Sequence, residues 1–227
     1  MQRGRQIPIP LSHPPAYDRD SYLIGDANRE AAELVLSWPQ WSAPVMLLCG
    51  PPGSGKTHLA RLWAEAADAR LVGAGDLGGQ GVAVGGNLGV ENVAAEAVPE
   101  RELFHLINRA REEGFFVLIT SRSPLADWRL TLKDTVSRLR LAVPVGLGEP
   151  DEELLRQVLV KLFADRQLEV ERAVVDYILV RMERSLSAAQ ALVAAIDEAA
   201  LSEGRRITRP LAARVLSDQP ESQQEEL

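Results

Sequence analysis

Residues 50–58 read GPPGSGKTH, a glycine-rich turn that ends in a lysine followed by a hydroxyl-bearing residue and a histidine. The apolar run APVMLLCG leads into this turn and predicts a buried parallel strand, and THLARLWAEAADA follows it with helical spacing. Glycines in this arrangement let backbone N–H groups face a phosphate, and the N-terminus of the following helix adds its dipole. The stretch therefore predicts a P-loop that binds a nucleotide.

Side chains of this loop have expected tasks as well. The ammonium of Lys56 is expected to reach the β- and γ-phosphates, and the hydroxyl of Thr57 is expected to hold Mg²⁺. The predicted nucleotide-binding residues of the loop are Gly50, Pro51, Pro52, Gly53, Ser54, Gly55, Lys56, Thr57 and His58. The expected cofactors are ADP or ATP, together with Mg²⁺.

Hydrolysis needs further groups, and the segment LGVENVA (residues 88–94) is the best candidate for the strand that carries them. Glu91 is predicted to act on the metal ion, whereas Asn92 cannot accept a proton and so cannot serve as a general base. A plain strand end and turn is the alternative for this pair. Intrinsic hydrolysis is expected to be weak under both interpretations.

Two later segments carry further candidates. ITSRSP (residues 119–124) places Thr120, Ser121 and Arg122 just after a core strand, where they could contact a γ-phosphate or an attacking water. A turn satisfied by Ser and Pro is the alternative. TLKDTVSRLRLAV (residues 131–143) supplies Arg138 and Arg140. One of these arginines could reach a partner's nucleotide as a trans finger, or both could be surface residues of a short helix.

Strands that alternate with helices predict the α/β fold class, with a parallel sheet covered by helices on both faces. Successive helical periods in the last third predict a small all-helical domain. The expected organisation is a flexible leader (1–20), an α/β nucleotide-binding domain (21–148), a helical domain (149–217) and a disordered acidic tail (218–227). The glycine-rich segment 72–90 is either a loose connection or two weak strands.

Composition narrows the function classes. The 227 residues carry a formal net charge of −7, which argues against a general binder of phosphate backbones. The single cysteine, Cys49, excludes an internal disulfide and is expected to be a buried structural thiol. No apolar run approaches the length of a membrane span, so we expect a cytoplasmic protein with no membrane partner.

Near its start the chain reads RQIPIPLSH, in which Pro8 and Pro10 disfavour both a helix interior and a central strand. The alternating aliphatic residues therefore fit neither of these elements. A leader that folds back on its own domain is one explanation.

In the order GPPGSGKTHLA, VLITSRSP, TLKDTVSRLRL and a helical tail, the motifs resemble the AAA+ module shared by the initiator DnaA and its relative Hda. The resemblance covers roughly residues 20–217. The stretch SYLIGDANREA is similar to the segment that borders the adenine in this family. The resemblance thus implies that Ile24, Gly25 and Asn28 lie near the base, and that the helical domain is a lid.

Within the family the chain is more similar to Hda, because Glu91 is followed by Asn92 and no basic helix-turn-helix domain follows the lid. Sequence-specific DNA binding is therefore not expected. Hda proteins also begin with a sliding-clamp-binding motif of the form Gln-Leu-x-Leu-Pro-Leu. The matching residues here are Gln6, Ile7, Pro8, Ile9, Pro10 and Leu11.

The resemblance implies a regulator of replication initiation whose partners are DnaA and the DNA polymerase III sliding clamp (beta subunit). Bound to ADP on a DNA-loaded clamp, such a protein promotes hydrolysis of the ATP held by DnaA. Arg138 matches the family's arginine finger, and Thr120 is the candidate sensor. Ser187 stands where many relatives have a nucleotide-sensing arginine, which leaves Arg184 as the candidate substitute.

Two other functions fit parts of the pattern. A self-sufficient P-loop ATPase, such as a helicase loader or remodeller, would turn over ATP by itself and leaves the leader peptide unexplained. A non-catalytic adaptor would use the clamp motif but would not need Arg138. The sequence leaves open whether the protein forms a homo-oligomer.

Overall fold

The computed structural model describes residues 22–78 and 85–218, which fall into two compact units that divide between Pro150 and Asp151. The predicted clamp-binding residues Gln6 to Leu11 and the tail beyond Asp218 lie outside the described residues. None of the described helices combines the length and the hydropathy that crossing a bilayer requires.

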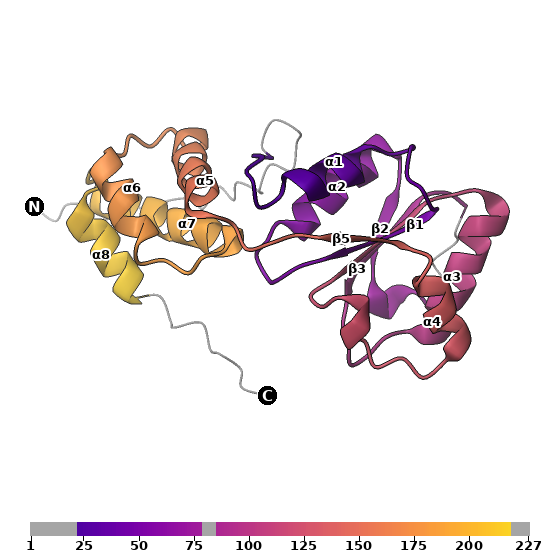
Figure 1. Ribbon diagram of the computed structural model, residues 1–227. Helices are drawn as coiled ribbons and strands as arrows, with labels where there is room; N and C mark the ends of the chain where they lie inside the picture. Colours follow the sequence, from indigo (N-terminus) through magenta and orange to yellow (C-terminus); the bar gives the residue numbers. More distant parts are fainter. Residues whose placement is uncertain (1–21, 79–84, 219–227) are drawn as a thin grey trace, which may run out of the picture. The chain divides into compact units, whose positions relative to one another are not determined.

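The first unit is a parallel five-stranded sheet with helices on both faces, in the strand order β2-β3-β4-β1-β5 (Figure 1). The strands are β1 (Val45–Cys49), β2 (Arg70–Gly73), β3 (Leu88–Val93), β4 (Val117–Ser121) and β5 (Val143–Gly146). Its helices are α1 (Arg29–Leu36), α2 (Lys56–Ala66), α3 (Glu100–Glu113) and α4 (Lys133–Leu139), with short 3₁₀ turns η2 (Ala74–Asp76) and η3 (Leu125–Asp127). This architecture confirms the predicted α/β fold class.

Strand β1 shows how the sequence builds the two layers. Its neighbouring residues face opposite sides of the sheet, and nearly every one of them is apolar and buried. Met46 and Leu48 join the core formed with α1 and α2, whereas Val45 and Leu47 join the core formed with α3 and α4. A strand that is apolar on both faces can lie only in the middle of such a sandwich.

The glycine-rich stretch between β2 and β3 resolves in part. Residues 88–93 form β3, which pairs in parallel with β2, so the expected weak strand LGVEN exists as part of a longer one. The other candidate strand, GVAV (residues 81–84), lies outside the described residues.

The second unit contains four helices around one apolar core: α5 (Glu152–Asp165), α6 (Arg172–Leu179), α7 (Leu186–Glu203) and α8 (Arg209–Asp218). Local capping sets their starts. The side chain of Asp151 accepts a hydrogen bond from the Leu154 N–H at 2.7 Å, and Ser185 accepts one from the Ala188 N–H at 3.1 Å.

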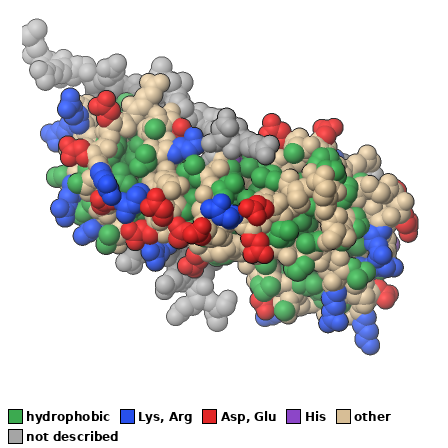
Figure 2. All heavy atoms as spheres, turned by 45° about the horizontal axis from the view of Figure 1, so that its top comes forward, with side chains coloured by type: hydrophobic (Ala, Val, Ile, Leu, Met, Phe, Trp, Pro, Cys, Tyr) green, Lys and Arg blue, Asp and Glu red, His purple; other side chains and the backbone are tan. Residues whose placement is uncertain are grey.

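On the face seen in Figure 2, acidic and basic side chains are interspersed, with no broad basic area.

Candidate nucleotide-binding site

The P-loop lies at the carboxyl edge of the sheet, where β1 runs into α2. The Gly50 N–H donates to the carbonyl of Ser121 at 3.2 Å, and the Leu147 N–H donates to the carbonyl of Cys49 at 2.7 Å. These bonds hold the start of the loop between the ends of β4 and β5. In open parallel sheets this edge is the usual ligand-binding position.

Glycines are required at three points of the loop. Gly53 and Gly55 have φ angles of 69° and 101°, in the region that other residues rarely adopt. A Cβ atom at Gly50 would lie 2.5 Å from the carbonyl oxygen of Leu147, so the close approach of the two chains excludes a side chain. Gly55 caps α2 without a side chain, so the first N–H groups of the helix have no side-chain acceptor from their N-cap.

Lys56 is largely buried, and its ammonium is already held by the loop. Nζ donates to the carbonyls of Gly50 at 2.7 Å and Pro51 at 2.8 Å. Burial lowers the pKa of Lys56, the positive charge of Arg122 lowers it further, and Cys49 opposes this shift. The carbonyls of Gly50 and Pro51 are neutral acceptors. A polyphosphate would give the ammonium a negatively charged acceptor, and such charge-assisted hydrogen bonds are stronger.

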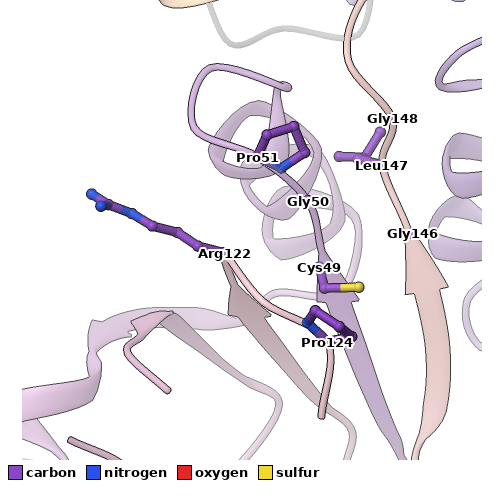
Figure 3. Close-up of a pocket in the computed structure, with 8 residues that line it drawn as sticks. All are labelled: Cys49, Gly50, Pro51, Arg122, Pro124, Gly146, Leu147 and Gly148. Carbon is purple, nitrogen blue, oxygen red and sulfur yellow. The ribbon is translucent and has the colours of Figure 1, made fainter. Parts of the chain in front are cut away.

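A pocket of about 540 Å³ opens beside the loop (Figure 3). Figure 3 shows the Arg122 side chain extending away from the Cys49 thiol. The pocket is lined by Cys49, Gly50, Pro51, Arg122, Pro124, Gly146, Leu147 and Gly148.

The expectation that the thiol of Cys49 is buried is wrong in part, because Cys49 is partly exposed. It is the last residue of β1 and pairs with Gly146, which has no side chain to cover it. Because Cys49 is still partly buried, desolvation raises the pKa of its thiol.

Two polar atoms of the site are buried without a hydrogen-bond partner among the described residues. They are Oγ of Ser54, within the loop, and Oε1 of Glu91, on β3. A buried carboxylate oxygen and hydroxyl oxygens, such as that of Thr57, are the donors that Mg²⁺ prefers, usually with phosphate oxygens and water. The residues present therefore fit a nucleotide with Mg²⁺. The described residues contain no group of three His, Cys, Asp or Glu side chains that could hold a metal ion.

The pair Glu91–Asn92 lies at an irregularity in β3. The pairing of β3 with β4 shifts between Val90 and Val93, and Asn92 takes a left-handed conformation with φ of 57°. The Asn92 N–H donates to Oγ1 of Thr120 at 3.0 Å, and Thr120 is buried. The structure thus joins the candidate metal strand directly to the candidate sensor.

The predicted adenine-side stretch is organised by Asn28, which is buried. Its Oδ1 accepts from the Gly25 N–H at 2.8 Å, and its Nδ2 donates to the Leu23 carbonyl at 2.9 Å. Asn28 therefore shapes this turn, while Ile24 is 46% exposed.

Sequence reasoning missed Tyr22, which connects this stretch to the P-loop. Its buried ring packs edge-on against His58, with centroids 5.0 Å apart, and burial raises the pKa of Tyr22 to about 12. An aromatic residue just before the predicted adenine stretch was the available signal.

The candidate arginines lie on other elements. Arg138 is half-buried in the last turn of α4, and Arg140, just beyond, is exposed; among the described residues neither forms an ion pair. In the second unit Arg184 precedes α7 and lies 3.8 Å from Glu152, with a side chain that is 63% exposed. The hydroxyl of Ser187 lies 3.2 Å from that of Ser185.

Comparison with known proteins places these features in context. The family model for the Hda lid domain matches residues 151–216. No curated protein matches the chain in sequence. Domain III of the Thermotoga maritima replication initiation protein DnaA superposes with a TM-score of 0.79 at 17% identity, covering 90% of this chain and 97% of that one.

Two other solved structures share the fold. The replication initiator DnaA bound to AMPPCP and single-stranded DNA gives a TM-score of 0.70 at 19% identity, covering 84% of this chain and 69% of that one. The Holliday junction branch migration motor RuvB of Thermotoga maritima gives 0.67 at 18% identity, covering 86% and 69%. The last third of the chain thus matches the Hda lid domain, and the chain as a whole shares the fold of DnaA domain III and of RuvB.

Proposed function

We propose that this DnaA-related AAA+ protein, while docked on a DNA-loaded sliding clamp, stimulates hydrolysis of the ATP bound to DnaA and thereby inactivates the initiator. The observation that carries the proposal is the match of residues 151–216 to the Hda lid domain. This lid segment follows a unit with a P-loop, in which Asn92 comes directly after the candidate metal ligand Glu91 on β3. This combination suits a protein that binds nucleotide and acts on a partner.

The protein's own nucleotide has a binding role in this proposal. Lys56, Thr57 and Glu91 would hold ADP or ATP with Mg²⁺, and the metal ion supplies neutralisation of phosphate charge. Asn92 provides no base, and its backbone N–H is occupied by Thr120. Slow intrinsic turnover follows from this arrangement.

Arg138 is the proposed group that acts in trans. A guanidinium keeps its charge at all physiological pH values and stabilises charge on a transferring phosphoryl group. Arg138 has no ion-pair partner among the described residues, so no described carboxylate competes for it.

Clamp docking is assigned to the leader peptide QIPIPL. Gln6 supplies a polar anchor, while Ile9 and Leu11 supply apolar side chains for a groove. Proline restricts the backbone of a peptide, which would reduce the conformational entropy lost on binding.

The test is hydrolysis of DnaA-bound ATP, measured with and without DNA-loaded clamp and with and without this protein. We expect acceleration only when this protein is present, and the largest acceleration when the clamp is loaded. A brisk steady-state ATPase of this protein alone, with no effect on DnaA, would instead favour a self-sufficient ATPase.

A further inference from the structure

Helix α4, which carries Arg138, begins without a cap of its own. It spans only seven residues, and its N-cap position is occupied by Leu132, whose side chain cannot accept a hydrogen bond. Helices this short are marginal in isolation, and their first N–H groups need acceptors from elsewhere. The orientation of α4 therefore depends on groups supplied by other elements.

Glu100, the first residue of α3, binds the two residues that lead into α4. Its carboxylate oxygens accept from the Thr131 N–H at 2.9 and 3.0 Å, from the Thr131 hydroxyl at 2.9 Å, and from the Leu132 N–H at 2.8 Å. One side chain thus holds the N-cap residue of a helix that begins more than 30 residues away in sequence. The bond to the Leu132 N–H is the one that the glutamate of a capping box makes locally, here made across the α3–α4 contact.

The carboxylate is held in its charged form. Burial opposes ionisation, but the hydrogen bonds from the backbone of Leu132 and from Thr131 outweigh it and lower the pKa of Glu100. The first turn of α3 also favours a negative charge through its dipole. Glu100 is therefore an anion at neutral pH and makes charge-assisted bonds to the start of α4.

Two other contacts connect the same pair of segments. The hydroxyl of Thr135, which is fully buried on α4, donates to the backbone carbonyl of Glu100 at 3.2 Å. The Arg129 N–H donates to the carbonyl of Ala95 at 3.0 Å. Ala95 and Glu100 flank the connection from β3 to α3, so the strand that bears Glu91 leads directly into the residues that hold α4.

At its other end α4 is fixed by Leu139, which is 1% exposed in the core beneath α3. Arg138 precedes Leu139 in the last turn, so its backbone is held by the buried leucine on one side and by the capped first turn on the other. We propose that Glu100 is a positioning residue that fixes α4 so that Arg138 is presented to the nucleotide of a partner subunit. This inference rests on the proposed trans role of Arg138.

Four variants of the full-length protein test the inference. Glu100→Ala removes the cap, and Glu100→Gln keeps one acceptor oxygen but loses the charge. Glu102→Ala is the matched control, because Glu102 is an acidic residue in the same first turn of α3 and makes no hydrogen bond or ion pair with the described part of the chain. Arg138→Ala is the reference for loss of the arginine itself.

Each variant is measured in two ways: amide hydrogen exchange in the peptide covering residues 130–137, and stimulated hydrolysis of DnaA-bound ATP as a function of the variant's concentration. We expect Glu100→Ala to speed exchange at Thr131 and Leu132. Its maximal stimulated rate should fall about 10- to 100-fold, as for other small displacements of catalytic groups, at a nearly unchanged half-saturating concentration. Glu100→Gln should lie between wild type and Glu100→Ala, and Glu102→Ala should match wild type.

Different results would overturn the positioning role of Glu100 and the trans role of Arg138. Faster exchange in Glu100→Ala with an unchanged maximal rate, while Arg138→Ala abolishes stimulation, would overturn the positioning role alone. Full stimulation by Arg138→Ala would overturn the arginine assignment and this inference with it. If Glu100→Ala does not fold, equal maximal rates for Glu100→Gln and wild type would overturn the positioning role.

Discussion

At the scale of single residues, Lys56 is a charged side chain buried within the P-loop. Its ammonium is buried at the loop and bonded to two backbone carbonyls, an arrangement that holds the charge ready for an anion. Ser54 and Glu91 add buried oxygen atoms that lack a partner among the described residues. The chemistry of these three groups suits phosphate oxygens and a small divalent cation, which is the ligand expected from the sequence.

Lys56→Ala should abolish nucleotide binding, because the phosphates lose their one positioned ammonium in the loop. Calorimetric titration with ADP checks this, and a thermal melt confirms that the variant is folded. Unchanged ADP affinity in a folded Lys56→Ala protein would contradict the assignment of the loop.

Glu100 makes a pH-dependent contribution that can be measured separately from function. Its folded-state pKa lies below the ordinary value of 4.5, so its stabilisation is fully present above pH 4.5 and is lost as pH falls through the folded pKa. The difference in melting temperature between wild type and Glu100→Gln should therefore be largest near pH 7 and shrink below pH 4.5. A difference that stays constant down to pH 3 would show that the hydrogen bonds to Thr131 and Leu132 do not stabilise the charged form.

At the scale of elements, the sequence predicts those helices and strands whose apolar pattern is long and contained in one contiguous segment. β1, α2, α3, β4 and the helices of the second unit could all be predicted from apolar runs, helical spacing and end signals. The short strands β2 and β5 could not. β2 has four residues and begins with the exposed Arg70, and β5 has four residues interrupted by Pro144, a residue that disfavours strands. Pairing with neighbouring strands makes both segments part of the sheet.

The candidate site divides in the same way. The P-loop can be predicted from the sequence because its residues are contiguous. The bond from Asn92 to Thr120 spans 28 residues and the cap of α4 by Glu100 spans 31, so neither leaves a local signal. Contacts of this kind depend on the sheet order, which brings β3 beside β4 and α3 beside α4.

The leader peptide provides a prediction about one segment. Replacing Gln6, Ile9 and Leu11 together with Ala should weaken clamp binding strongly, because a few anchors usually carry most of a short peptide's affinity. Surface plasmon resonance on immobilised clamp measures the effect, and replacing Arg3 and Arg5 with Ala, outside the motif, provides the control. Normal clamp binding by the triple variant, combined with a melting temperature several degrees lower, would show that the segment belongs to the protein's own core.

At the scale of the whole molecule, one unit carries the candidate nucleotide site and helix α4 with Arg138, and the other unit carries the segment that matches the Hda lid domain. Structural similarity to DnaA domain III at 17% identity shows how far this fold persists when most residues differ. In the proposed function two positions matter most: Asn92, which would limit the protein's own catalysis, and Arg138, which would act on a partner's nucleotide.

The most direct test of this function is single-turnover hydrolysis of ATP pre-bound to DnaA, in the presence of DNA-loaded clamp, with wild type, Arg138→Ala or Arg140→Ala. Wild type and Arg140→Ala should accelerate hydrolysis. Arg138→Ala should bind nucleotide and clamp normally yet lose most of the acceleration, because arginine fingers supply roughly 10³ to 10⁵ in rate. Hydrolysis at the same rate with and without wild-type protein would contradict the proposed function, and full acceleration by Arg138→Ala would contradict the trans arginine.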